Sequence, residues 1–150
     1  MLTYNKQVID FKWPDVWAFV ECSNRLSGNR PLEEWYQNTL SEGARFQFDS
    51  LLKMNHKTKN HKEWQGFRGF LKGKADRYKI WELGFKADGR QYRVFGIFGN
   101  ARRQAILLCG CYHKMCVYMP PNIIKSACAM VTAIKEGRMN LHERKINSDL

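Results

Sequence analysis

The pattern of apolar and polar positions predicts a strand followed by two helices in the first part of the chain. The run VWAFVECS, from Val16 to Ser23, is rich in aromatic and β-branched residues, and turn-forming residues follow it. Pro31 suits the first turn of a helix, and Ser41 can cap a second one. Apolar residues recur at helical spacing along one face of each helix: Leu32, Trp35, Tyr36 and Leu40 in the first, Ala44, Phe48, Leu51 and Leu52 in the second. We expect the two helices to form a hairpin that covers a sheet.

Three strands and a last helix are predicted further along. Between Tyr78 and Pro121, three apolar-rich segments are separated by Asp88-Gly89 and Gly99-Asn100, dipeptides that supply the positive φ angles of tight hairpin turns. This arrangement predicts a three-stranded antiparallel meander. Pro120-Pro121 ends it, and the last helix is expected to be capped by Asn122, to end at Gly137 and to bury Ile123, Ile124, Ala127, Val131 and Ile134.

The predicted fold class is therefore α+β, with an N-terminal strand, a helical hairpin, the meander and a C-terminal helix. The expected organisation is an N-terminal extension at residues 1–15, one domain at residues 16–138, and a polar, loose tail at residues 139–150. The N-terminus has no apolar leader, and no apolar run approaches the ~20 residues that a membrane span needs. We expect a cytoplasmic protein.

Charge is distributed unevenly along the chain. The net charge is +11, yet residues 1–50 hold five Lys/Arg against seven Asp/Glu, whereas residues 51–150 hold twenty against seven. Such a field favours a polyanion, and nucleic acid is the commonest one. The basic segment at residues 53–79 is interpreted as a loop in which His56 and His61 are solvated. Its candidate RNA contacts are Arg68, Lys72, Lys74, Arg77 and Lys79.

The glycines of this basic segment do not indicate a nucleotide site. The stretch GFRGFLKGK lacks the Gly-Lys-Ser/Thr ending that holds phosphate and magnesium, because Ala75 follows Lys74. We therefore expect no nucleotide cofactor.

Five cysteines are an odd number in a chain without a secretion signal, which argues against a disulfide framework. The stretch CGCYHKMC places Cys109, Cys111, Cys116 and His113 together and raises a zinc hypothesis. The spacing argues against zinc, because Cys109, Cys111 and His113 alternate along one strand face instead of forming two knuckles. We expect no metal, and expect the cysteines to pack as small hydrophobic residues.

Several motifs follow one another along the chain: Trp81-Glu82-Leu83, Tyr92-Arg93-Val94, Ile106-Leu107-Leu108, Gly110, His113-Lys114 and Pro120-Pro121 before a helix. In order and spacing they resemble those of the RelE/HigB toxins of bacterial and phage toxin-antitoxin modules. The resemblance covers roughly Val16 to Gly137. It implies a small ribonuclease that cuts messenger RNA in the ribosomal A site and is inhibited by an antitoxin, expected to be a helix-turn-helix protein.

The candidate catalytic residues can be weighed by their chemistry. In metal-free RNA cleavage the 2′-hydroxyl attacks the adjacent phosphate, which requires a base, an acid and positive charge. Arg93 suits the phosphate, since a guanidinium is permanently charged and can hold two oxygens. His113 can act as base or acid near neutral pH, and Lys114 can add charge or protonate the leaving oxygen. The resemblance implies that Tyr118 matches a tyrosine near the scissile phosphate.

Two positions depart from the resembled enzymes and leave the identity of the acid and base open. Tyr112 stands where some relatives carry a basic residue, and it is kept as an RNA contact. Glu82 stands where some carry a lysine. Strand alternation places Glu82 on the open side of the sheet if Trp81 and Leu83 face the helices. There Glu82 can serve as a base, although a simpler role is an ion pair with Arg93 across the hairpin.

Two other functions stay open. The related ParE-like toxins share the scaffold and poison DNA gyrase by binding, so the frame alone does not prove catalysis. A basic nucleic-acid-binding phage accessory protein without catalysis also fits the charge. His113, Lys114 and Tyr118 favour the nuclease, whereas the departures at Glu82 and Tyr112 keep the non-catalytic class open.

Overall fold

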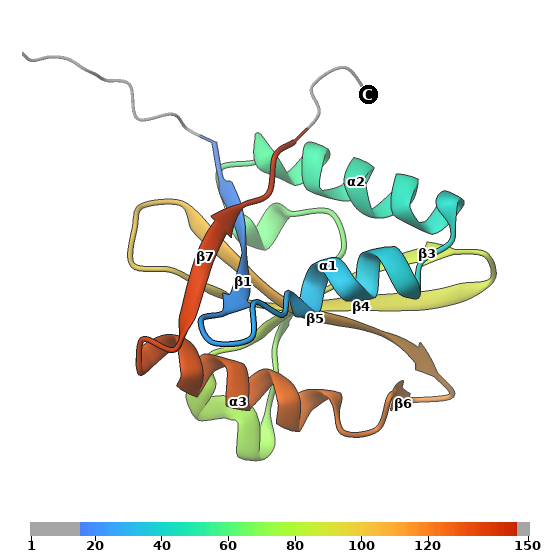
Figure 1. The fold of residues 1–150 in the computed structure, drawn as a ribbon. Coiled ribbons are helices and arrows are strands. Elements are labelled where there is room, and N and C mark those ends of the chain that lie inside the picture. Colours follow the sequence, from blue (N-terminus) through green and yellow to red (C-terminus); the bar gives the residue numbers. More distant parts are fainter. Residues whose placement is uncertain (1–15, 147–150) are drawn as a thin grey trace, which may run out of the picture.

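A computed structural model describes residues 16–146, which form an α+β fold around one mixed sheet (Figure 1). The predicted α+β class is confirmed. The extension expected at residues 1–15 lies outside the described residues, as does the end of the tail at 147–150.

The first elements begin and end where the capping residues indicate. Strand β1 spans Ala18–Asn24, helix α1 spans Pro31–Asn38, and helix α2 spans Glu42–His56. Ser41 Oγ accepts a hydrogen bond from the backbone amide of Ala44, and the Ser41 hydroxyl donates to Asp88 in the Asp88-Gly89 turn. All residues of the two predicted apolar stripes are buried or half-buried, so the helical hairpin is confirmed.

The predicted meander forms the middle of a larger sheet. Its strand order is β2-β3-β4-β5-β1-β7, with β6 paired to the last residues of β5. Strand β1 runs parallel to β5, and all the other pairs within residues 16–146 are antiparallel. The strands after β1 are β2 (Phe67–Phe70), β3 (Trp81–Ala87), β4 (Arg90–Phe98), β5 (Gln104–Lys114), β6 (Val117–Met119) and β7 (Met139–Glu143).

The two predicted turns of the meander differ in outcome. Asp88 and Gly89 have positive φ angles of 54° and 74°, as a tight hairpin turn requires. The tight turn expected at Gly99-Asn100 is wrong. The connection there spans residues 99–103, and the positive φ angle falls on Arg103, at 54°. A longer loop closes through a left-handed residue near its end.

Strand β5 contains a β-bulge. Phe95 of β4 pairs with Cys109, while the next residue, Gly96, pairs with Leu107. Leu108 is therefore an extra residue on β5, and both sides of it pair regularly with β4.

Three strands do not follow from the sequence pattern. Strand β2 and the 3-10 helices η2 (His61–Glu63) and η3 (Gly73–Tyr78) lie in the basic segment interpreted as a loop. Strand β6 follows a turn at Met115-Cys116, where both residues have positive φ angles. The expectation of a loose tail is wrong for β7, which pairs with β1 through main-chain hydrogen bonds that do not depend on apolar alternation.

The two histidines expected to be solvated are half-buried, so that expectation is wrong. His56 Nδ1 lies 2.7 Å from the Trp17 carbonyl oxygen. The ring of His61 packs among aromatic rings, 4.7 Å from Phe98 and 5.3 Å from Phe67 between centroids. Burial lowers the pKa of His61, so this ring is neutral at physiological pH.

Helices cover both faces of the sheet (Figure 1). Helices α1 and α2 pack on one face, where Trp35 lies over Gly110 so closely that a Cβ there would be 2.3 Å from the indole. Helix α3 (Ile123–Lys135) and η3 pack on the other face. The predicted α3 is confirmed and is followed by Gly137 at a φ angle of 74°, although the Asn122 side chain makes no capping hydrogen bond.

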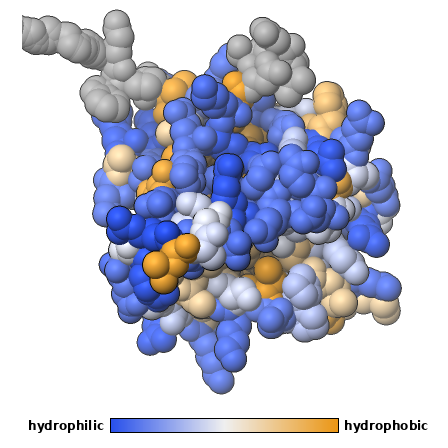
Figure 2. All heavy atoms as spheres, viewed as in Figure 1, coloured by the Kyte–Doolittle hydropathy of each residue, from blue (hydrophilic) through white to orange (hydrophobic). Residues whose placement is uncertain are grey.

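The molecular surface is largely polar on the side that shows α1 and α2. Figure 2 shows this side as mostly hydrophilic, with small separate apolar spots. Among residues 16–146, no helix has the length and apolar character needed to cross a membrane.

Candidate nucleic-acid site

A row of polar side chains crosses the α3 face of the sheet, near the β3–β4 and β5–β6 turns. The strand register aligns Lys86 with Gln91, Gln91 with His113, and His113 with Tyr118. Residues directly opposite each other in antiparallel strands share one face. Lys86 is exposed and the other three are half-buried, so solvent reaches this row. The structure thus brings the predicted residues His113 and Tyr118 together.

A buried ion pair lies beside this row. Arg93 Nε is 3.1 Å from Glu82 Oε2, and the two residues are 5% and 9% exposed. The Tyr118 hydroxyl donates to the two carboxylate oxygens of Glu82, at 3.0 and 3.1 Å. Burial, helped by the Glu82 charge, raises the pKa of Tyr118 to about 12. Tyr118 therefore keeps its proton at neutral pH and can act as a hydrogen-bond donor.

The predicted pairing of Glu82 with Arg93 is confirmed, whereas the open position expected for Glu82 is wrong. Glu82 does face away from α1 and α2, but the chain folds back after β5 as β6 and places Tyr118 over the carboxylate. Arg93 is buried with its partner and also donates to the Tyr92 carbonyl oxygen at 3.0 Å. Its guanidinium is therefore held inside the fold.

Gly84 leaves space for two arginine side chains on this face. A Cβ at Gly84 would lie 2.9 Å from Arg93 Nη1 and 3.1 Å from Arg68 Cδ. Arg68, predicted as an RNA contact, is exposed and has no hydrogen bond or ion pair within residues 16–146. An unpaired cation therefore lies next to the buried Arg93–Glu82 pair.

His113 and Lys114 occupy the accessible end of the site. The rings of His113 and Tyr118 pack with their centroids 4.9 Å apart. His113 makes no hydrogen bond to any described residue, so its ring nitrogens remain available to a ligand. Lys114 follows it at the end of β5 and is exposed. Strand alternation points the imidazole and the ammonium group to opposite faces, and both residues line one cavity at the open end of the strand.

A cavity of about 340 Å³ lies between the tips of the two hairpins. It is lined by Gly89 to Gln91 on one side and by Tyr112 to Met115 on the other. The guanidinium of Arg90 lies over the Tyr112 ring, 4.3 Å from its centroid. Sequence reasoning missed Arg90 and Gln91, although their place directly after the Asp88-Gly89 turn was a usable signal.

Of the remaining predicted RNA contacts, Tyr112 lines the cavity, whereas the basic residues near η3 belong to another part of the surface. Tyr112 belongs to the α1–α2 face of the sheet, opposite to that of His113. Arg77 donates to the Tyr78 hydroxyl at 2.8 Å and lies over that ring. The four basic residues of this group lie in or beside η3 and are exposed: Lys72, Lys74, Arg77 and Lys79.

The cysteines divide into buried and accessible thiols. Cys22, Cys109 and Cys111 are buried, Cys128 is half-buried and Cys116 is exposed. Burial raises the pKa of the first three well above the ordinary thiol value, which favours the unreactive protonated form. The buried three pack as small hydrophobic residues, as expected. Residues 16–146 contain no group of three or more His, Cys, Asp or Glu side chains arranged to hold a metal ion.

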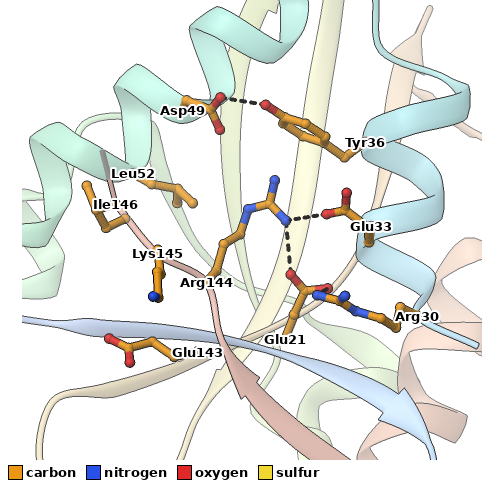
Figure 3. A pocket seen from close by; sticks show the side chains of 10 residues that line it. All are labelled: Glu21, Arg30, Glu33, Tyr36, Asp49, Leu52, Glu143, Arg144, Lys145 and Ile146. Atoms are coloured by element: carbon orange, nitrogen blue, oxygen red, sulfur yellow. Dashed lines mark hydrogen bonds and ion pairs between the residues drawn. The ribbon is translucent and has the colours of Figure 1, made fainter. Parts of the chain in front are cut away.

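A second cavity, of about 430 Å³, lies on the opposite face of the sheet (Figure 3). There Arg144 donates to Glu21 at 2.9 Å and to Glu33 at 2.8 Å, and Arg30 forms an ion pair with Glu21 at 3.1 Å. The Tyr36 hydroxyl donates to the carboxylate of Asp49 in α2. Glu21, the one carboxylate inside the predicted first strand, was the sequence signal for this cluster. Because its charges pair with one another, the cluster joins β1, α1 and the segment after β7.

Comparison with known proteins identifies no relative. No family model matches the sequence, and no curated protein and no solved structure matches it.

Proposed function

We propose that the protein is a metal-free endoribonuclease whose active site is centred on His113. The observation that carries the proposal is the packing of His113 against Tyr118 above the Arg93–Glu82 pair, beside the exposed Lys114. A titratable group is thereby positioned by a buried, hydrogen-bonded scaffold, which is how catalytic residues are commonly held in place.

Each residue of the site has a distinct role in the proposed reaction. His113 takes the proton of the 2′-hydroxyl while O2′ attacks the phosphorus atom. Lys114 donates a proton to O5′ as the P–O5′ bond breaks, which yields a 2′,3′-cyclic phosphate and a 5′-hydroxyl. Arg68 provides charge for the phosphorane. Arg93 is a positioning residue, because it fixes Glu82, which in turn fixes the Tyr118 ring against His113.

The biological setting we propose is that of a RelE/HigB-like toxin. The order of strand, two helices, three antiparallel strands and helix supports this proposal, with β2, β6 and β7 as additions. The substrate would then be messenger RNA on the ribosome in the cytoplasm, and a cognate antitoxin would restrain the activity. The exposed lysines and arginine near η3 supply a surface for the RNA backbone.

The burial of Arg93 and Glu82 favours a second candidate function. A catalytic arginine must contact the phosphate, yet this one is 5% exposed and paired within the fold. A basic nucleic-acid-binding protein without catalysis would use Arg68, Lys114 and the residues near η3 and leave the pair as a structural element.

Mapping of transcript ends separates the two candidates. Wild-type protein is added to ribosomes translating a messenger RNA, beside His113→Ala and a control, His142→Ala, whose ring contacts Ser23 in the β1–β7 pair. The nuclease proposal expects cleavage by wild type and control and a loss of about 100- to 10,000-fold in His113→Ala. Equal cleavage by His113→Ala would remove His113 from the mechanism. RNA binding without cleavage by any of the three proteins would favour the second candidate.

Binding at different salt concentrations tests the backbone contact. Arg68→Gln should reduce the slope of log affinity against log salt by about 0.7, the value for one lost contact to single-stranded RNA. Glu63→Gln, which changes charge at an exposed position of η2, serves as the control and should not lower the slope.

A further inference from the structure

The cavity between the two hairpin tips has the features of a nucleobase site. It is bounded by Gly89, which adds no side chain and has open space where a Cβ would lie. Because the cavity lies at the ends of β4 and β5, it is lined from both faces of the sheet, by the Arg90–Tyr112 pair from one and by Gln91 and His113 from the other. Its volume of about 340 Å³ is within the range of small-ligand pockets.

We propose that this cavity binds one base of single-stranded RNA, next to the bond that is cut. The inference rests on the proposed function, because His113 lines the same cavity and is the register partner of Gln91. A phosphate placed at His113 therefore leaves the adjacent base at the cavity. Unpaired bases in RNA commonly stack on aromatic rings and on arginine guanidinium planes.

Arg90 is the principal base-contacting residue of the site. One face of its guanidinium contacts the Tyr112 ring, so the opposite face can stack on a base. Arg90 is exposed and has no hydrogen bond or ion pair within the described part of the chain, which leaves its donors unpaired. Gln91 offers both a donor and an acceptor, which suits the edge of a base. These two residues should therefore determine the preferred nucleotide.

The first measurement uses binding without cleavage. Single-stranded RNA with 2′-methoxy groups cannot be cut, and a single 2-aminopurine is placed at each position in turn. Because stacking quenches 2-aminopurine fluorescence, wild-type protein should quench the probe at one position. Arg90→Lys keeps the charge but lacks the planar group, so it should lose the quenching. The control Arg102→Ala, an exposed cation of the β4–β5 loop, should retain it.

The second measurement is the nucleotide preference at the cleavage site, obtained by sequencing transcript ends. Arg90→Lys and Gln91→Ala should each relax the preference at one position by about 5- to 150-fold, the range for a lost base contact. The base site would be overturned if both variants cut RNA with the wild-type nucleotide preference and if Arg90→Lys quenched the probe as the wild type does. The proposed nuclease activity would stand in that case. Quenching that depends on Arg90, without cleavage by the wild type, would support the base site and reject the nuclease.

Discussion

Removal of Arg93 should destabilise the fold strongly, because it leaves Glu82 buried without its cation. At the 3.1 Å separation of the ion pair, Coulomb's law gives about 5 kcal/mol of attraction with an effective dielectric constant of about 20. Breaking such a buried pair costs about 3–5 kcal/mol, because one charge remains desolvated. The Tyr118 hydrogen bonds do not replace a cation. We expect Arg93→Met to lower the free energy of unfolding by that amount, a large part of the roughly 5–15 kcal/mol of a typical domain.

A double-mutant cycle tests this reasoning. Glu82→Leu alone also leaves a buried charge, whereas Arg93→Met with Glu82→Leu removes both charges and should cost less than either single substitution. Unfolding in urea can be followed by the fluorescence of the buried tryptophans Trp17, Trp35, Trp64 and Trp81. If the cost of the double variant equals the sum of the two single costs, the pair is not coupled and the positioning role of Arg93 fails.

Three further predictions follow from the pKa shifts and the burial of the thiols. Burial alone would raise the pKa of Glu33, but hydrogen bonds from Gln37 and Arg144 lower it. Its contribution to stability is therefore present above the unfolded pKa of about 4.3 and is lost as pH falls through the lower folded value. Acid unfolding curves should show this loss in wild type and a smaller one in Glu33→Gln. A thiol reagent should label Cys116 fastest in native protein, and Cys116→Ser should remove that fast labelling phase. Equally fast labelling of Cys109 would contradict the burial of that thiol in the core. The raised pKa of Tyr118 means that stability falls as pH rises from about 10 towards 12, and an ultraviolet titration of Tyr118→Phe should lack one late-ionising phenol.

Local patterns predicted the elements that carry strong side-chain signals. The apolar stripes of α1 and α2, the cap at Ser41 and the Asp88-Gly89 turn each follow from a few neighbouring residues, and all are present. Strand β7 carried no such signal. Four of its five residues are exposed, and it is held by main-chain pairing with β1, more than a hundred residues earlier in the chain. Pairing of this kind depends on which strand the rest of the fold leaves without a neighbour on one side.

The sequence predicted which residues belong to the candidate site better than it predicted how they are arranged. The ion pair of Glu82 with Arg93 followed from strand alternation and hairpin pairing. The burial of that pair did not, because it results from β6 folding back and placing Tyr118 over the carboxylate. Arg144 was assigned to a loose tail, yet it is half-buried and paired with Glu21 and Glu33, an arrangement that only the tertiary fold creates.

The extra residue at the β5 bulge has a consequence for the length of this strand. Leu108 is the additional residue, and the pairs on both sides, Gly96 with Leu107 and Phe95 with Cys109, have regular partners. A deletion of Leu108 would therefore preserve the pairing of β5 with β1 before it and the alignment of His113 with Gln91 after it. A variant that lacks Leu108 should thus keep the histidine in register, at the cost of some core packing. A search for proteins with the same site should allow a gap at this position.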